Sequence, residues 1–174
     1  MAVIENPNYP KLLIVSDMAV IPLPDFKQKI AICKYLAATA RALGIEKPKV
    51  AAIAATEQML DGMPACVEAA LLAKMSDRGQ IAGCVVDGPL AMDVAIDPES
   101  VAIKKVKSEV AGDADCLLFP NIETGNVFYK CCTKFSHAEL GALLKGAKVP
   151  CVLSSCGDSA KTKMYSIALA ALMA

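Results

Sequence analysis

Polar and positively charged side chains gather between residues 120 and 130, directly after a short apolar run. The run at 116–119 predicts a strand buried on both faces, and Pro120 would end it. In an open parallel sheet, ligands bind beyond the carboxyl ends of strands, where the next helix offers free N–H groups to an anion. A glycine there would let the backbone approach a ligand, and a lysine would add positive charge. The candidate ligand-binding residues are Asn121, Glu123, Gly125, Asn126 and Lys130. An ordinary strand–turn–helix connection remains the alternative.

Two further turns carry groups that could bind the same anionic ligand. Residues 87–89, which include Gly88, follow a predicted strand, and residues 154–159 follow another. If these strands are parallel neighbours, all three turns meet at one edge of the sheet and form a cradle for phosphate and a carbonyl oxygen. The last turn contributes Ser154, Ser155, Asp158 and Ser159.

Five strands, each followed by a helix, would position these turns. Strands are predicted at 12–15, 50–54, 84–86, 116–119 and 151–153. Helices are predicted at 26–43, 66–75, 127 onward, 137–144 and 161–173. Residues 1–10 are expected to be an irregular lead-in, 91–96 are either helical or extended, and 101–110 form an exposed helix or loop. This alternation predicts an α/β domain with a mainly parallel sheet.

Composition excludes several classes of protein. The formal net charge is zero, which gives no indication of a general nucleic-acid or membrane-surface binder. No apolar run is long enough to predict a membrane span. The eight cysteines include no C-x-x-C pair, so we expect small buried thiols in a reducing cytoplasm and no zinc site. No Gly-x-Ser-x-Gly, Gly-x-x-x-x-Gly-Lys or Gly-x-Gly-x-x-Gly motif occurs, and the lone His137 is assigned no catalytic role.

The segment 120–130, Pro-Asn-Ile-Glu-Thr-Gly-Asn-Val-Phe-Tyr-Lys, resembles the signature of the phosphate acetyl/butyryltransferase family. The resemblance favours the butyryltransferase branch and covers nearly the whole chain, through segments 63–70, 74–81, 86–93, 146–150 and 163–171. It implies a three-layer α/β/α fold of the isocitrate/isopropylmalate dehydrogenase-like type. The implied reaction moves an acyl group between coenzyme A and inorganic phosphate, with coenzyme A as a substrate and no metal or covalently bound cofactor. Ser155 and Asp158 are then the catalytic candidates, and the other residues named above, with Gly88, bind substrate.

The chain departs from this family in two ways. Full-length members begin with another segment, so residues 1–153 would correspond to the inserted second domain. Residues 154–174 would correspond to a helix that returns to the first domain. The family usually has Ser-Arg where this chain has Ser155 and Cys156. Cysteine cannot make the bidentate, permanently charged contact of arginine. The alternative is therefore a catalytically incomplete module that binds coenzyme A or an acyl group, or a subunit completed by another polypeptide. We also expect a homodimer, because the apolar face at 164–173 would otherwise stay uncovered.

Overall fold

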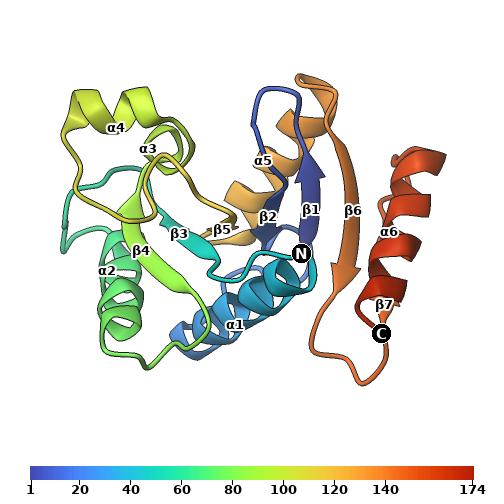
Figure 1. Ribbon diagram of the computed structural model, residues 1–174, viewed down its shortest axis with the longest axis horizontal. Helices are drawn as coiled ribbons and strands as arrows, with labels where there is room; N and C mark the ends of the chain where they lie inside the picture. Colours follow the sequence, from blue (N-terminus) through green and yellow to red (C-terminus); the bar gives the residue numbers. More distant parts are fainter.

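In the computed structural model, which describes residues 1–174, strands and helices alternate along most of the chain (Figure 1). The strands are β1 (Ala2–Glu5), β2 (Leu13–Ser16), β3 (Lys49–Ile53), β4 (Val85–Leu90), β5 (Cys116–Leu118), β6 (Glu139–Leu144) and β7 (Cys151–Val152). The helices are α1 (Phe26–Ala42), α2 (Pro64–Asp77), α3 (Met92–Ile96), α4 (Pro98–Lys104), α5 (Ile122–Lys134) and α6 (Ala160–Leu172).

Local signals set the bounds of α1, which confirms the predicted helix. Asp25 Oδ1 accepts a hydrogen bond from the Gln28 backbone N–H at 2.8 Å, and Gln28 Oε1 accepts one from the Asp25 N–H at 2.8 Å. This reciprocal capping box satisfies two donors that would otherwise lack partners at the helix start. Gly44 follows the last turn with a φ of +92°, a conformation that glycine adopts without steric cost.

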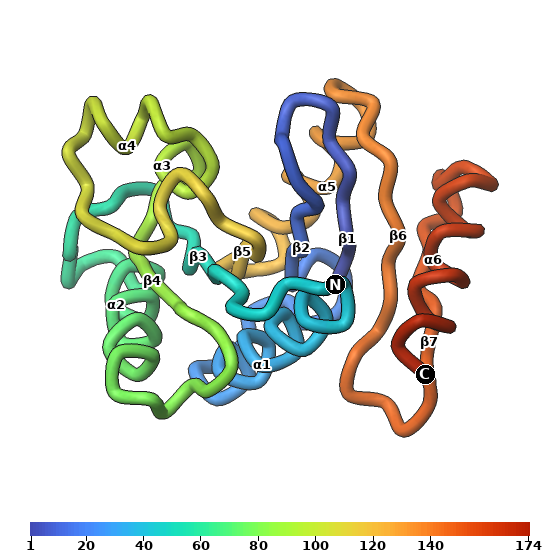
Figure 2. The backbone as a smooth tube through the Cα atoms, in the orientation of Figure 1, coloured from blue at the N-terminus to red at the C-terminus, as the bar shows by residue number.

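All seven strands form one sheet in the order β4-β3-β5-β2-β1-β6-β7. Strands β4, β3, β5 and β2 pair in parallel, whereas β1 is antiparallel to both β2 and β6. Strand β7 is antiparallel to β6, so it runs against the main direction. Strand β6 therefore shares the direction of the parallel strands, and only β1 and β7 oppose it. Figure 2 shows the path from β6 through the hairpin into β7 and then into α6.

Helices cover both faces of the sheet, which confirms the predicted three-layer α/β/α architecture. Side chains from α1, α2 and α6 pack on one face, and side chains from α3 and α5 pack on the other. In β2, Ile14 packs on the face covered by α1, α2 and α6, while Leu13 and Val15 pack on the face covered by α3 and α5. This alternation follows the two-residue period of a strand. Because strands are covered on both faces, they read as continuous apolar runs.

The prediction was wrong for two segments that form strands. Residues 1–10 were expected to be irregular, yet Ala2–Glu5 form β1, and the prolines and asparagines begin only after this strand. Residues 137–144 were expected to be helical, yet Glu139–Leu144 form β6. Both strands owe their structure to pairing with each other across more than 130 residues of sequence. Tertiary packing of this kind overrides local propensity.

Two element boundaries also differ from the prediction. Residues 87–89 were expected to form a loop, but they lie within β4, where Asp87 pairs with Ala51 of β3. Proline is tolerated there because β4 is an edge strand with one unpaired side. Helix α5 begins at Ile122 and not at 127, because Asn121 Oδ1 accepts from the Thr124 N–H at 2.9 Å and caps the helix.

Helix α5 docks against the loop after β2 through a glycine. A Cβ added to Gly125 would overlap the carbonyl oxygen of Asp17 and come within 3.0 Å of the Phe119 ring. Gly125 is buried, and the close approach that it permits is to the chain's own backbone.

We therefore predict that Gly125→Ala destabilises the fold. Alanine favours a helix over glycine by about 1 kcal/mol. Overpacking against backbone, which cannot rotate away, costs about 1–3 kcal/mol and should prevail. Gly62→Ala is the matched control, since a Cβ there meets nothing within 4 Å. Urea denaturation followed by circular dichroism should show a lower midpoint for Gly125→Ala only, and equal midpoints for the two variants would refute the packing argument.

Candidate functional site

A cleft of about 270 Å³ lies between α5, the middle of β6 and the turn that follows β7. Its lining combines polar groups with an apolar wall. The lining residues are Met18, Ala19, Ile122, Asn126, Tyr129, Lys130, Ala142, Leu153, Ser154, Ser155 and Asp158. Five of the ten predicted site residues are among them: Asn126, Lys130, Ser154, Ser155 and Asp158.

One face of α5 forms the first wall. Asn126, Tyr129 and Lys130 have the i, i+3, i+4 spacing that places side chains on one side of a helix. The Asn126 amide donates to the Met18 carbonyl at 3.1 Å and fixes the loop after β2. The Lys130 ammonium lies 5.1 Å from the centroid of the Tyr129 ring, a favourable cation–π position. Lys130 forms none of the chain's salt bridges, so no carboxylate neutralises its charge within 4 Å.

The turn after β7 forms the second wall. Asp158 Oδ2 accepts from the Ser155 backbone N–H at 2.6 Å, and the Asp158 N–H donates to the Ser155 carbonyl at 3.0 Å. Asp158 Oδ1 accepts from the Tyr129 hydroxyl at 3.0 Å, which ties this turn to α5. Burial raises the pKa of the Tyr129 phenol, and the hydrogen bond to Asp158 raises the same pKa further. The phenol is therefore a protonated donor throughout the neutral range.

The other predicted site residues lie outside the lining. Asn121 and Glu123 are at the start of α5, where the Asn121 side chain caps the helix and Glu123 is exposed. Gly125 lies against Asp17, as described above. Ser159 caps α6, since its Oγ accepts from the Thr162 N–H at 3.1 Å. Gly88 lies in β4, three strands away from β2. A Cβ added to Gly88 would come within 2.7 Å of the Ala52 carbonyl oxygen and 3.1 Å of the Ala69 side chain.

The two walls do not meet in the way that the sequence suggested. The expectation was that three parallel strands end at one edge, but β7 is antiparallel to β6 and residues 87–89 lie within β4. The turn instead leaves β7 beside the middle of β6, where the Leu153 N–H approaches the Ala142 carbonyl at 3.5 Å. Helix α5 packs on the face of the sheet to which Ala142 of β6 contributes. The cleft thus lies along the flank of α5, and its polar groups can hold an anion beside a polarised carbonyl.

Sequence reasoning missed the other six lining residues: Met18, Ala19, Ile122, Tyr129, Ala142 and Leu153. Tyr129 had a detectable signal, because it falls on the same helical face as Asn126 and Lys130. Met18 had none, since its contact with Asn126 spans 108 residues.

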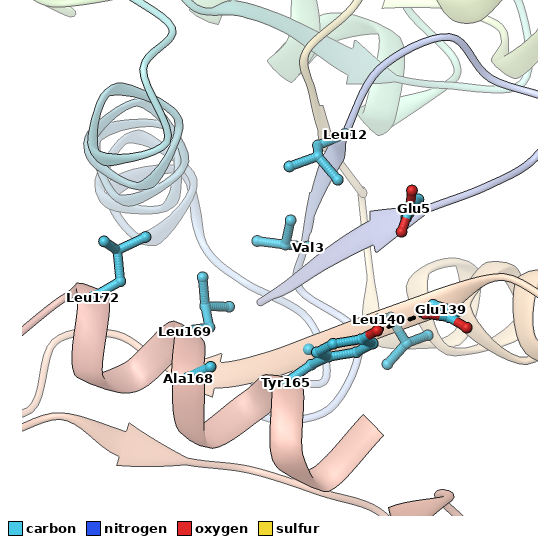
Figure 3. Close-up of a pocket in the computed structure, with 10 residues that line it drawn as sticks. Val3, Glu5, Leu12, Glu139, Leu140, Tyr165, Ala168, Leu169 and Leu172 are labelled. Atoms are coloured by element: carbon cyan, nitrogen blue, oxygen red, sulfur yellow. Dashed lines mark hydrogen bonds between the residues drawn. The ribbon is translucent and has the colours of Figure 1, made fainter. Parts of the chain in front are cut away.

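A larger groove of about 450 Å³ lies between α6 and strands β1 and β6 (Figure 3). Its lining is mainly apolar, and Leu169 and Leu172 of α6 face Val3 and Leu12 across it. Tyr165 donates to Glu139 Oε2 at 2.9 Å at one end of the groove. The groove holds no cation or convergent donors suited to phosphate, so it is not the candidate site for the predicted chemistry.

The structure contains neither a metal-binding cluster nor a membrane-spanning helix. No group of three or more His, Cys, Asp or Glu side chains is placed to hold a metal ion. None of the helices combines the length and the apolar character that crossing a bilayer requires.

Known proteins resemble this chain over its whole length. The phosphate butyryltransferase of Clostridium acetobutylicum is 51% identical over 174 residues, which are 100% of this chain and 58% of that protein. The phosphate acetyltransferase of Thermotoga maritima is 42% identical over 174 residues, which are 100% of this chain and 59% of that protein. This chain thus spans less than two thirds of the length of these curated relatives.

Solved structures share the fold. A branched-chain phosphotransacylase from Enterococcus faecalis V583 superposes with a TM-score of 0.90 at 35% identity, covering 98% of this chain and 61% of that one. The EutD phosphotransacetylase from Staphylococcus aureus gives a TM-score of 0.78 at 26% identity, covering 98% of this chain and 52% of that one. The sequence profile described as phosphate acetyl/butaryl transferase matches residues 1–171. Since that match covers nearly every residue and the relatives agree with it, the chain belongs to the phosphate acetyl/butaryl transferase family.

Proposed function

We propose that this chain transfers an acyl group between coenzyme A and inorganic phosphate, in the manner of a phosphate butyryltransferase. A phosphate oxygen attacks the thioester carbonyl carbon, the carbonyl becomes a tetrahedral oxyanion, and the C–S bond then breaks. The products are an acyl phosphate and the thiol of coenzyme A, which takes up the proton that phosphate loses. Coenzyme A serves as a substrate, and no covalently bound cofactor is needed.

One observation carries the proposal: a lysine ammonium and a serine-rich turn from distant parts of the chain line the same cleft. The Lys130 ammonium, free of any carboxylate partner, would attract phosphate and offset charge in the transition state. The Ser154 and Ser155 hydroxyls supply hydrogen-bond donors for a phosphate oxygen or for the developing oxyanion. Asp158 would set the geometry of the turn that carries these serines.

The remaining predicted residues take supporting roles in this proposal. Asn126 lines the cleft beside the proposed substrate, and its side-chain amide holds the loop at Met18. Asn121, Glu123 and Gly125 lie in the first turn of the same helix, and their contribution is to start and seat α5. Ser159 begins α6 directly after the turn, and Gly88 allows β4 to pack closely on β3 and α2.

Turnover should depend on Lys130, which lines the cleft. Mixing the chain with butyryl-CoA and phosphate should release free coenzyme A, measured with a thiol reagent. Lys130→Ala should lower kcat/KM by about 100-fold, the usual loss when one transition-state donor is removed. Lys134→Ala, an exposed lysine at the end of the same helix and outside the cleft, is the matched control. No release of coenzyme A above background at millimolar substrate would refute the proposed activity, even if calorimetry detected binding of coenzyme A.

Cys156 is an exposed residue next to Ser155 in the chain, where the family resemblance places arginine. Cys156→Arg should raise kcat/KM by about tenfold, because guanidinium makes bidentate, permanently charged contacts with phosphate. Cys156→Lys separates charge from geometry, and Cys156→Ser controls for loss of the thiol. A rate for Cys156→Arg that equals the parent rate would show that charge at this turn does not limit the reaction.

We infer a homodimer, because α6 exposes apolar side chains beside the apolar groove: Met164 is 56% exposed, Ile167 62% and Leu172 56%. Contiguous apolar surface of this kind usually marks an interface. Sedimentation should give twice the mass of one chain, and Ile167→Lys should halve it. Val127→Lys is the control, an equally exposed apolar residue (63%) on α5. A monomeric parent chain would contradict the inference.

A further inference from the structure

Asp158 uses both of its carboxylate oxygens within the protein. Oδ2 accepts from the Ser155 N–H at 2.6 Å, and Oδ1 accepts from the Tyr129 hydroxyl at 3.0 Å. The first bond closes the turn on itself, and the second attaches the turn to α5. Each oxygen of the Asp158 carboxylate thus accepts from a donor of the protein, and the side chain holds the backbone of the turn in place.

Little else fixes this turn. Strand β7, which precedes it, is only two residues long, and Ser154, Cys156 and Gly157 are exposed. The Ser155 Oγ contact with the Gly157 N–H is long, at 3.4 Å. The bond from Tyr129 crosses 29 residues of sequence and is the hydrogen bond that joins the turn to the opposite wall.

The ring of Tyr129 lies beside the lysine of its own wall. The Lys130 ammonium lies 5.1 Å from the ring centroid. The ring itself is buried at 6% exposure, so its position is set by the core that α5 forms with the sheet. One rigid side chain therefore touches the cation of one wall and, through Asp158, the backbone of the other.

We propose that Tyr129 is a positioning residue, whose hydroxyl fixes the Ser155 turn through Asp158 at a set distance from Lys130. This inference rests on the proposed function and assigns a role to a residue that touches no reacting atom. The hydroxyl would keep the two walls correctly placed, so that the protein's donors hold both anionic substrates in the reactive orientation. A misplacement of about 1 Å can cost about 100-fold in rate. The raised pKa of the phenol agrees with a permanent donor and not with a proton shuttle.

The test compares two tyrosines that each donate to a carboxylate. Tyr129→Phe removes the hydroxyl and keeps the ring beside Lys130. Tyr165→Phe is the matched control, because Tyr165 donates to Glu139 at 2.9 Å in the apolar groove, outside the cleft. We expect Tyr129→Phe to lower kcat by about tenfold, the loss expected for a hydrogen bond to a charged group. The KM for butyryl-CoA should stay within about twofold, and the pH dependence of kcat should keep its shape. Tyr165→Phe should change none of these.

A double-mutant cycle separates positioning from independent effects. Asp158→Ala should reproduce the loss of kcat, and adding Tyr129→Phe to it should cause no further loss, since both changes break the same link. Additive losses would overturn the proposal, and so would a basic limb of the pH profile that moves in Tyr129→Phe. If Tyr129→Phe fails to fold, the comparison of Asp158→Ala with Tyr165→Phe still decides, because a kcat for Asp158→Ala equal to the parent value would overturn the proposal.

A second readout does not depend on turnover. In ¹⁵N-labelled protein, the Ser155 amide proton should resonate downfield because it donates to a carboxylate. Tyr129→Phe should shift the Ser155 and Gly157 amides and speed their hydrogen exchange, whereas Tyr165→Phe should leave them unchanged. If the parent chain shows no turnover, the proposed function fails and these amides alone decide the positioning role. Amides that stay unchanged in Tyr129→Phe would overturn it.

Discussion

Strand β1 joins the two parts of the sheet, and the candidate cleft depends on that junction. It lies between β2 and β6 and is antiparallel to both. On one side of β1 are the parallel strands that carry α1 and α2, and on the other are β6, β7 and α6. Ala2 and Ile4 are fully buried, so the strand contributes core as well as hydrogen bonds. Without β1, the β6–β7 hairpin would lose its ladder to the rest of the sheet, and the serine-bearing turn would lose its place opposite α5.

The cleft itself results from opposed directions of two neighbouring segments. Helix α5 descends over one face of the sheet after β5, while β7 runs back along the outer edge of β6. The turn after β7 therefore emerges beside the middle of the helix and not at its start. Asn126 and Lys130 therefore line the cleft, and at the start of α5 Ile122 also reaches it, whereas Asn121 and Glu123 do not. The site uses the flank of a helix and its side chains more than the free N–H groups of a helix start.

Sequence reasoning succeeded where the signal was local. The Asp25 cap and the apolar period fixed α1, and the apolar run before Pro120 located β5. It failed where pairing partners are distant: Ala2–Glu5 and Glu139–Leu144 form strands because they pair with each other, and neither segment carries a strong strand pattern alone. The motif at 120–130 includes residues of α5 that line the candidate cleft. The predicted geometry differs from the observed one. The prediction assumed that parallel strands end at a common edge, but β7 is antiparallel to β6.

The charges of the cleft constrain how it could catalyse acyl transfer. Phosphate and coenzyme A are both anions, and the cleft offers one unpaired ammonium, at Lys130, near the carboxylate of Asp158. At 4 Å, two unit charges interact by about 4 kcal/mol at an effective dielectric constant of 20, so one lysine offsets a single phosphate charge at most. Holding reactants in line can contribute about 7–11 kcal/mol. In the proposed reaction, rigid placement of the two walls would therefore contribute more than charge, and the hydrogen bond from Tyr129 to Asp158 is the link between those walls.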